Sequence, residues 1–388
     1  MGNFRATLIE LFSRVIKIVD DKKDGEVYWN GENNLYPNEV ERVVNNSATA
    51  SRASKIMAKY IAGSGLVNEA QDIEVNPSKN YKLSNICSLA GEEMSEQGGA
   101  WFHVGYGISD DGSKVIPKTL DILDYVKCRK GREDDDNNDR KVFYKDFAEK
   151  KAMFEKTKET KWFYPFDKTQ KVVVAQIKAD YTAKKGEFTD DIAEMLPHYR
   201  GQVYYLNLTP RFKYALSPVD SVCNDADSEF RISNYVNSNV REGFLGKTMV
   251  LTQGLDEEKA KEIELQIGQW LGSENSSGVF YMDVAQADDL SKVVYVNQLK
   301  AQFDEKLFTE TNKNLQSKIL GAYNSIPELL VISNSGTMFG TSGEAYIQAK
   351  KFYNEQTADE RWRLSETLTY LGFPCEIKPI NDGTTEIL

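Results

Sequence analysis

Apolar residues recur at steps of three and four along much of the chain, a spacing that places them on one face of an α-helix. The pattern is clear from Ser47 to Ala62. A hydroxyl residue that can cap a helix opens this stretch, and Gly63, which can end a helix, follows it. The same spacing predicts helices over 84–96, 217–243, 256–271, 298–324 and 343–372.

Other stretches carry the β-branched and aromatic residues that are typical of strands. They cover 100–108, 114–123, 126–130, 172–177, 202–208, 247–251, 278–282 and 292–296. Residues 20–46 are expected to be irregular, because Asn30-Gly31 and Tyr36-Pro37 are turn signals. Residues 184–195 form a polar segment between the predicted strands. The stretch 325–343 begins apolar, becomes rich in Gly, Ser, Thr and Asn, and predicts a loop.

The order of these elements predicts an α+β protein. The 388 residues are enough for two or three domains, and residues 1–216 read as one mixed α/β domain. Helices over 217–244 and 298–324 enclose a small α/β module at 245–297. Their narrow apolar stripes, with a seven-residue repeat in the second helix, favour packing between long helices. The residues expected at this packing are Phe230, Val236, Phe308, Leu315 and Ile319.

The formal net charge is −11, whereas a dedicated DNA-binding protein is usually basic. Two readings stay open. The chain is simply an acidic protein, or an acidic wall suits a conduit along which DNA slides, since phosphate contacts would create affinity. No apolar run approaches the roughly 18 residues that span a bilayer. The amphipathic stretch 6–19 lacks a small-residue cleavage site, so no signal peptide is expected.

The sequence offers few groups for catalysis or metal binding. Its four cysteines are far apart and form no CxxC pair, which argues against a disulfide framework or zinc cluster and fits a reducing compartment. Two histidines are too few to favour zinc sites or a Ser-His-Asp triad. The neighbouring carboxylates Glu92 and Glu93, or Asp121 and Asp124, could serve acid–base chemistry. Nothing fixes their separation, so surface charge is the expected role.

Two further motifs fail on inspection. Gly246-Lys247-Thr248 ends like a phosphate-binding loop, but Arg241 stands where the first glycine is required, and the strand follows the motif instead of preceding it. The acidic run 133–139 has the spacing of a calcium loop but holds Asp139 and Lys145 at the positions for Gly and Glu. The sequence therefore predicts no catalytic, cofactor-binding or metal-binding residue.

Several segments follow one another in an order that is known from one family. They are 215–219 at the entry to the first long helix, 247–251 at the start of the small module, 302–319 in the returning helix, 319–330 with the sequence ILGAYNSIPELL, and 342–357 after the following loop. Segments 33–37, 61–66 and 124–130 add to them. In this order the chain resembles the portal proteins of tailed bacteriophages.

The resemblance implies a portal-type architecture with each part assigned. Residues 1–216 would form the N-terminal part of a wing, 217–244 a stem helix, 245–297 a nested clip, 298–324 a second stem helix, 325–343 a tunnel loop, and 344–388 the C-terminal wing helix with a short tail. The helical crown of many portals would be short or absent, because few residues follow Gly372.

The resemblance also implies a function, which is not enzymatic. The chain would be a subunit of a ring, typically of twelve copies, at the unique capsid vertex. The ring would form the channel for packaging and ejection of the genome. Its expected partners are double-stranded DNA, the large subunit of terminase, a head–tail adaptor and the major capsid protein, with no cofactor and no membrane. It would be assembled in the host cytoplasm and reside in the virion.

Within that architecture, the loop would narrow the channel and touch DNA transiently. The residues expected to face DNA are Asn334, Ser335, Thr337, Met338, Phe339 and Thr341. Two other interpretations stay open on the residues alone. One is a different ring-forming component of a phage or secretion system, and the other is an acidic enzyme whose site no motif reveals.

Overall fold

The computed structural model describes most of the chain. The described residues are 23–24, 27–67, 70, 72–131, 141–148, 161–186, 189, 191–241, 248–253, 279–284, 297–298, 305–331 and 343–380. The chain divides into a larger compact unit, Met1–Ala226 with Gln316–Leu388, and a smaller one, Asp227–Leu315. The mixture of helices and strands confirms the α+β class expected from the sequence.

Three helices form the centre of the larger unit. They are α1 (Tyr36–Asn46), α2 (Ala48–Ala62) and α3 (Leu83–Gln97). Ser47 separates the first two, and its side chain accepts a hydrogen bond of 3.0 Å from the backbone N–H of Ala50. Helix α1 corrects the expectation of irregular structure over 20–46. Pro37 lies in its first turn, where the missing N–H costs nothing, so the Tyr-Pro pair opens a helix instead of forming a turn.

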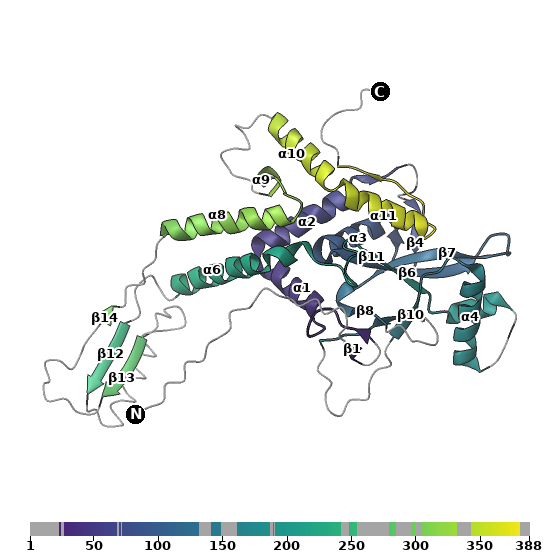
Figure 1. Ribbon diagram of the computed structural model, residues 1–388, viewed down its shortest axis with the longest axis horizontal. Coiled ribbons are helices and arrows are strands. Elements are labelled where there is room, and N and C mark those ends of the chain that lie inside the picture. Colours follow the sequence, from purple (N-terminus) through teal and green to yellow (C-terminus); the bar gives the residue numbers. More distant parts are fainter. Residues whose placement is uncertain are drawn as a thin grey trace. The chain divides into compact units, whose positions relative to one another are not determined.

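A six-stranded mixed sheet lies beneath these helices in the strand order β7-β6-β11-β10-β9-β8. Its strands are β6 (Gly99–Ile108), β7 (Val115–Leu123), β8 (Cys128–Lys130), β9 (Val142–Tyr144), β10 (Lys161–Pro165) and β11 (Gln202–Asn207). Only the β10–β11 pair is parallel among these pairings. Figure 1 shows α3 along the sheet, α2 beside α3, and the C-terminal helix α11 over α2.

The parallel pair requires a crossover, and helix α4 (Gln170–Lys185) supplies it with the short helix α5 (Ile192–Met195). The strand expected over 172–177 is therefore wrong. The β-branched residues there suggested a strand, but Val173, Ile177 and Tyr181 are buried at steps of four, which is the helical period. The polar segment expected over 184–195 likewise contains the end of α4 and all of α5.

Short strands and turns complete the larger unit. Strand β1 (Lys23–Asp24) pairs with β2 (Val27–Tyr28), and β4 (Glu74–Asn76) pairs with β5 (Tyr81–Lys82). Strand β3 (Gly65–Leu66) pairs with β15 (Ile377–Lys378) near the end of the chain. Single 3-10 turns are η2 (Tyr125–Lys127), η3 (Leu196–His198) and η4 (Pro218–Val222).

The C-terminal part of the larger unit contains α9 (Glu328–Val331), α10 (Gly343–Gln356) and α11 (Ala358–Tyr370). The sequence predicted a single helix over 343–372, and the structure corrects this to two helices with a break at Thr357. The Thr357 hydroxyl donates to the carbonyl of Tyr353 at 2.9 Å, a side-chain bond that bends helices. Helix α9 also shows that the segment 325–343 begins with a helical turn.

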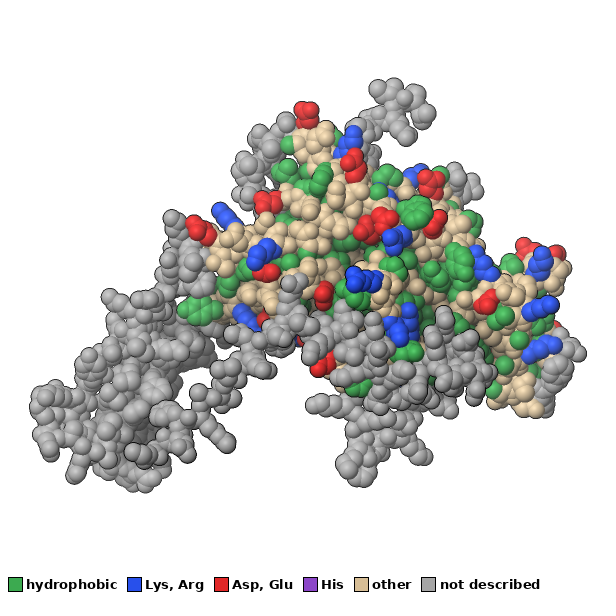
Figure 2. Space-filling view, in the orientation of Figure 1, with side chains coloured by type: hydrophobic (Ala, Val, Ile, Leu, Met, Phe, Trp, Pro, Cys, Tyr) green, Lys and Arg blue, Asp and Glu red, His purple; other side chains and the backbone are tan. Residues whose placement is uncertain are grey.

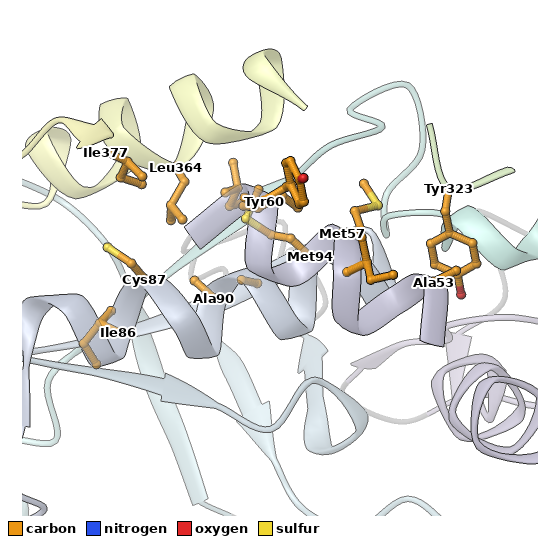
Figure 3. Packing of buried hydrophobic residues seen from close by; sticks show 14 of the residues in the cluster. Ala53, Met57, Tyr60, Ile86, Cys87, Ala90, Met94, Tyr323, Leu364 and Ile377 are labelled. Carbon is orange, nitrogen blue, oxygen red and sulfur yellow. The ribbon is translucent and has the colours of Figure 1, made fainter. Parts of the chain in front are cut away.

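The main hydrophobic core joins the two ends of the chain. Residues of α1, α2, α3 and β6 pack with residues of α8, α10, α11 and β15, and Figure 3 shows part of this cluster around Met57, Met94 and Tyr60. The rings of Tyr60 and Tyr353 meet edge to face with centroids 4.7 Å apart. Burying each large aliphatic side chain here contributes about 1.5–3 kcal/mol relative to exposure. Helices α8, α10 and α11 and strand β15 are therefore an integral part of this core.

The smaller unit contains a three-stranded sheet with the order β13-β12-β14. Strand β12 (Thr248–Gln253) pairs in parallel with β13 (Val279–Val284) and antiparallel with β14 (Asn297–Gln298). The helix expected over 256–271 and the strand expected over 292–296 lie outside the described residues. Helix α6 (Cys223–Arg241) leads into this unit, and α8 (Glu305–Ala322) leads out of it.

Candidate interaction surfaces

The residues predicted to face DNA cannot be placed in the fold. Asn334, Ser335, Thr337, Met338, Phe339 and Thr341 all lie between α9, which ends at Val331, and α10, which begins at Gly343, outside the described residues. Their role stays a prediction.

The residues predicted for packing between the long helices differ in burial. Ile319 is fully buried in the main core, and Leu315 is 7% exposed. Phe230 and Val236 of α6 are partly buried, and the side chain of Phe308 lies outside the described residues. The last turns of α8 therefore bury an apolar face, whereas α6 keeps much of its surface accessible. The packing of the two long helices against each other stays a prediction.

The entry to α6 is fastened to the larger unit by a small hydrogen-bond network. Ser217 precedes η4, and its hydroxyl donates to the carbonyl of Glu96 while accepting from the N–H of Val219. Its backbone N–H donates to the Tyr36 hydroxyl at 3.0 Å, and that hydroxyl donates to Asp220 at 3.2 Å. Burial raises the pKa of Tyr36 well above its ordinary value. The cap that the sequence predicted thus also links α6 to α1 and α3.

The turn that follows α8 is also held in place by side-chain hydrogen bonds. Asn324 and Ser325, which follow the helix, both have left-handed backbone conformations, with φ of 57° and 56°. Such a turn costs energy for residues other than glycine, so it persists only where neighbours hold it. The Asn324 side-chain amide donates to Glu360 at 2.8 Å and to the carbonyl of Gln356 at 3.1 Å. These bonds connect the end of α8 to the break between α10 and α11.

Exposed large apolar side chains gather on the last helices. Seven such residues occur in the described part of the chain, and five of them belong to α9–α11: Leu329, Tyr346, Phe352, Trp362 and Tyr370. Trp362 is the most exposed, at 57%. Figure 2 shows hydrophobic side chains on the surface over α10 and α11. We call these five residues the C-terminal aromatic surface. Aromatic residues concentrated on one region of a surface favour a protein contact there.

A cavity of about 460 Å³ opens between α1, α2 and α3. It is lined by small and charged residues, including Ser54, Lys55, Ser95 and Glu96. The two hydroxyl groups of Ser54 and Ser95 hydrogen-bond to each other at 3.1 Å, and the Ser95 hydroxyl also donates to the backbone carbonyl of Glu92 at 2.9 Å.

Two carboxylates of α3 have raised pKa values. Burial raises the pKa of Glu93 to about 8, and the charges of Asp124 and Glu96 add to the effect, while a hydrogen bond from the backbone N–H of Tyr125 opposes it. Burial also raises the pKa of Glu96, with help from Glu41. The sequence singled out Glu93 but favoured an exposed charge, because nothing local indicates that it is enclosed.

Two features commonly sought in a site are not found in the described part of the chain. No group of three or more His, Cys, Asp or Glu side chains there is arranged to hold a metal ion. Nor does any helix in those ranges combine the length and apolar character needed to cross a membrane. The acidic run 133–139 and the segment around Gly246 lie outside the described residues.

Comparison with known proteins is informative only at the level of structure. No protein-family model and no curated protein sequence matches the chain. Among solved structures, a chain from the neck of an empty gene transfer agent (GTA) particle, computed with C6 symmetry, matches 96% of this chain and 91% of its own length, with 13% identity and a TM-score of 0.54. This chain has a portal-type fold.

Two further matches have TM-scores below 0.5. A portal protein of the HK97 phage family from Corynebacterium diphtheriae covers 87% of this chain and 94% of its own length, with 9% identity and a TM-score of 0.46. A chain of the neck of the native GTA particle, computed with C12 symmetry, covers 90% and 86%, with 12% identity and a TM-score of 0.49. At these identities the likeness concerns the fold alone. The portal resemblance inferred from the sequence is confirmed at that level.

Proposed function

We propose that the chain is a portal-like subunit that assembles into a ring at the neck of a phage-like particle. The observation that carries the proposal is the match over 96% of the chain to a component of a GTA neck computed with C6 symmetry. The ordered sequence segments from 215 to 357 support it independently. The ring would have twelve copies and surround the channel through which double-stranded DNA is packaged and ejected. It would be assembled in the host cytoplasm and remain in the virion.

The parts of the chain would then take separate tasks. The larger unit would serve as the wing, surrounded by major capsid protein. Helices α6 and α8 would form the stem, and the module at 245–297 would be the clip on which the large terminase subunit and then the head–tail adaptor dock. In support, the smaller compact unit Asp227–Leu315 contains that module, and the larger unit is built from residues on both sides of it.

The segment between α9 and α10 would act as the tunnel loop. Small polar residues with an apolar tip at Met338-Phe339 suit a segment that contacts DNA without holding it. Deleting residues 337–339 should reduce DNA packaging or retention while rings still form. Packaging at the wild-type level by rings of the deletion variant would contradict this role.

The C-terminal aromatic surface would be covered by the neighbouring copy in the ring. Its exposed Phe352 and Trp362 are the kind of side chains that carry energy at protein interfaces. We expect the double change Phe352→Ser with Trp362→Ser to lower the fraction of chain found in rings by roughly tenfold or more. Ile73→Ser is the matched control, because Ile73 is 45% exposed but lies outside α9–α11. If the double variant and the control assemble into rings equally well, this surface does not contribute to the interface between copies.

Images of the purified full-length chain in negative stain test the main proposal. A ring with an open centre and a protruding stem is the expected result. A ring without that protrusion would favour the second candidate, another ring-forming component of a phage or secretion system. A small monomer at all concentrations and salt conditions would refute the ring.

A further inference from the structure

The cavity between α1, α2 and α3 has room for a large side chain. Its volume is about 460 Å³, and small residues form much of its lining, with Ser51, Ala58 and Ala62 on α2 and Ser88 on α3. Helices α2 and α3 are already in close contact, because a Cβ on Gly91 would come within 2.7 Å of the Ala58 carbonyl oxygen. The two helices therefore cannot move together to close the cavity.

The lining of the cavity is mixed in character. Methyl groups of Val44, Ala58 and Ala62 contribute to it together with the hydroxyl groups of Ser51 and Ser88. Tryptophan combines a large apolar ring system with a single N–H donor, which usually finds a hydrogen-bond partner when the ring is buried. The mixture of methyl and hydroxyl groups therefore suits an indole side chain better than an aliphatic one.

The rim of the cavity is charged, and the two helices differ in sign. Lys55 and Lys59 lie one turn apart on α2, and both side chains are exposed. Neither lysine has an ion-pair partner among the residues that the structure describes. Glu92 and Glu96 line the α3 side. We call the two lysines the basic rim. A partner that fits this cavity must bring negative charge to the basic rim and keep it away from the α3 side.

Helix α11 offers a side chain with that pattern of charge around it. Trp362 is 57% exposed, the highest value among the exposed large apolar residues of the described part of the chain. Asp359 and Glu366 lie three residues before it and four residues after it, so they share its face, and both are exposed. Asp359 is paired with Arg363 at 2.7 Å, but such an exposed pair can exchange partners at little cost.

The opposite side of Trp362 carries no charge. At 3.6 residues per turn, Ala358, Ser365 and Thr369 flank Trp362 on the side away from Asp359 and Glu366. A Trp362 ring placed in the cavity can therefore bring its two carboxylates to the basic rim while only neutral residues approach the acidic α3 side. In a single chain Trp362 stays largely exposed, so this contact requires a second copy.

We propose that Trp362 of one copy enters the cavity between α1, α2 and α3 of the next copy. Its neighbours Asp359 and Glu366 then lie beside the basic rim. The proposal rests on the proposed function, in which copies of the chain surround a channel, and it names the two surfaces that join them. Both belong to the larger unit but are different parts of it, so the contact is head to tail. Repeated head-to-tail contacts form a ring when the rotation between copies closes, and an open filament when it does not.

Exchange of charge between the two surfaces tests the contact, with the fraction of full-length chain in rings measured by gel filtration and negative stain. Lys55→Glu with Lys59→Glu should lower that fraction roughly tenfold or more, because like charges then meet. Asp359→Lys with Glu366→Lys should do the same. The chain that carries all four changes should recover most of the wild-type fraction, since opposite charges face each other again.

A matched control makes the same change of charge elsewhere. Lys171→Glu with Lys184→Glu reverses two exposed lysines of α4, which does not line the cavity, and this variant should assemble like the wild type. Thermal melting followed by circular dichroism checks that every variant is folded.

A cross-linking measurement needs no charge reversal. A photo-reactive benzoyl-phenylalanine replaces Trp362 and keeps a large aromatic side chain at that position. We mix this chain with isotopically labelled wild type, irradiate the mixture, and locate the cross-links by peptide mapping. The expected cross-links join position 362 of one copy to residues 44–63 or 88–96 of another.

The outcomes separate this contact from the proposed function. The contact is overturned if the variant with all four changes assembles no better than the two half-exchanged variants, or if the cross-links join other parts of the chain. Rings that form whichever charges are reversed also contradict the contact but leave the proposed function intact. Open filaments that carry the expected cross-links contradict only the proposed ring.

Discussion

The partly buried Glu93 of α3 makes a quantitative prediction about the dependence of stability on pH. Glu93 has a pKa of about 8 in the folded protein against an ordinary value of 4.5, chiefly because of burial and then because of the charges of Asp124 and Glu96. The folded chain therefore keeps this proton up to a higher pH than the unfolded chain does. The stabilisation is complete below pH 4.5 and is lost as the pH rises through 8.

The size of the effect follows from the two pKa values. Their difference is 8 − 4.5 = 3.5, and at about 1.4 kcal/mol per pKa unit the free energy of unfolding falls by about 5 kcal/mol between pH 4 and pH 9. That is comparable with the whole stability of a small domain. Glu93→Gln removes the titration but keeps an acceptor for the N–H of Tyr125. We expect the variant to be more stable than the wild type at pH 9, with a difference of less than about 1 kcal/mol at pH 5.

Thermal unfolding at pH 5, 7 and 9, followed by circular dichroism, measures this. At about 2 °C per kcal/mol, the variant should melt roughly 5–10 °C above the wild type at pH 9. Glu92→Gln is the matched control, because Glu92 is the preceding residue of the same helix and is exposed. If Glu93→Gln and the wild type lose stability in parallel from pH 5 to pH 9, Glu93 does not hold its proton in the folded protein and the reasoning fails.

Four other changes give contrasting outcomes that thermal or chemical unfolding can measure. Gly91→Ala would place a Cβ 2.7 Å from the carbonyl oxygen of Ala58, so α2 and α3 must move apart at a cost of about 1–3 kcal/mol; unchanged stability would contradict such close packing. Gly321→Ala meets no atom within 4 Å and should stabilise α8 by roughly 0.5–1 kcal/mol. Arg361→Met strands backbone carbonyls of α2 and α10 that its guanidinium now binds at 3.0 and 2.9 Å, and should cost about 2–4 kcal/mol. Lys318→Ala breaks a solvent-exposed ion pair and should cost less than about 1 kcal/mol, and a larger loss would mean that this pair is coupled to other contacts.

Much of the local structure follows from the sequence alone. Helix α2 lies at Ala48–Ala62, between the cap at Ser47 and the stop at Gly63 that the pattern predicted. Helix α3 and the antiparallel strands β6, β7 and β11 also agree with their predicted ranges to within one or two residues. These signals are local, because caps, breakers and periodicity depend on residues within about one helical turn or a few strand positions of each other. The order of the elements, read in the same way, was enough to indicate the portal-type fold.

What the sequence could not supply depends on contacts between distant segments. The β-branched run at 172–177 lies in helix α4, where its buried residues pack against residues of β7 and α5. Tertiary packing of this kind overrides propensity. The bend at Thr357 depends on the hydrogen bond from its hydroxyl to a backbone carbonyl of the preceding turn. The raised pKa of Glu93 depends on burial and on the charge of Asp124, which lies far from it in the sequence. Tyr60 and Tyr353 gave no motif, since nearly 300 residues separate them in the chain. Only the folding of the C-terminal segment onto α2 and α3 brings their rings together, because burial and proximity are properties of the packed core.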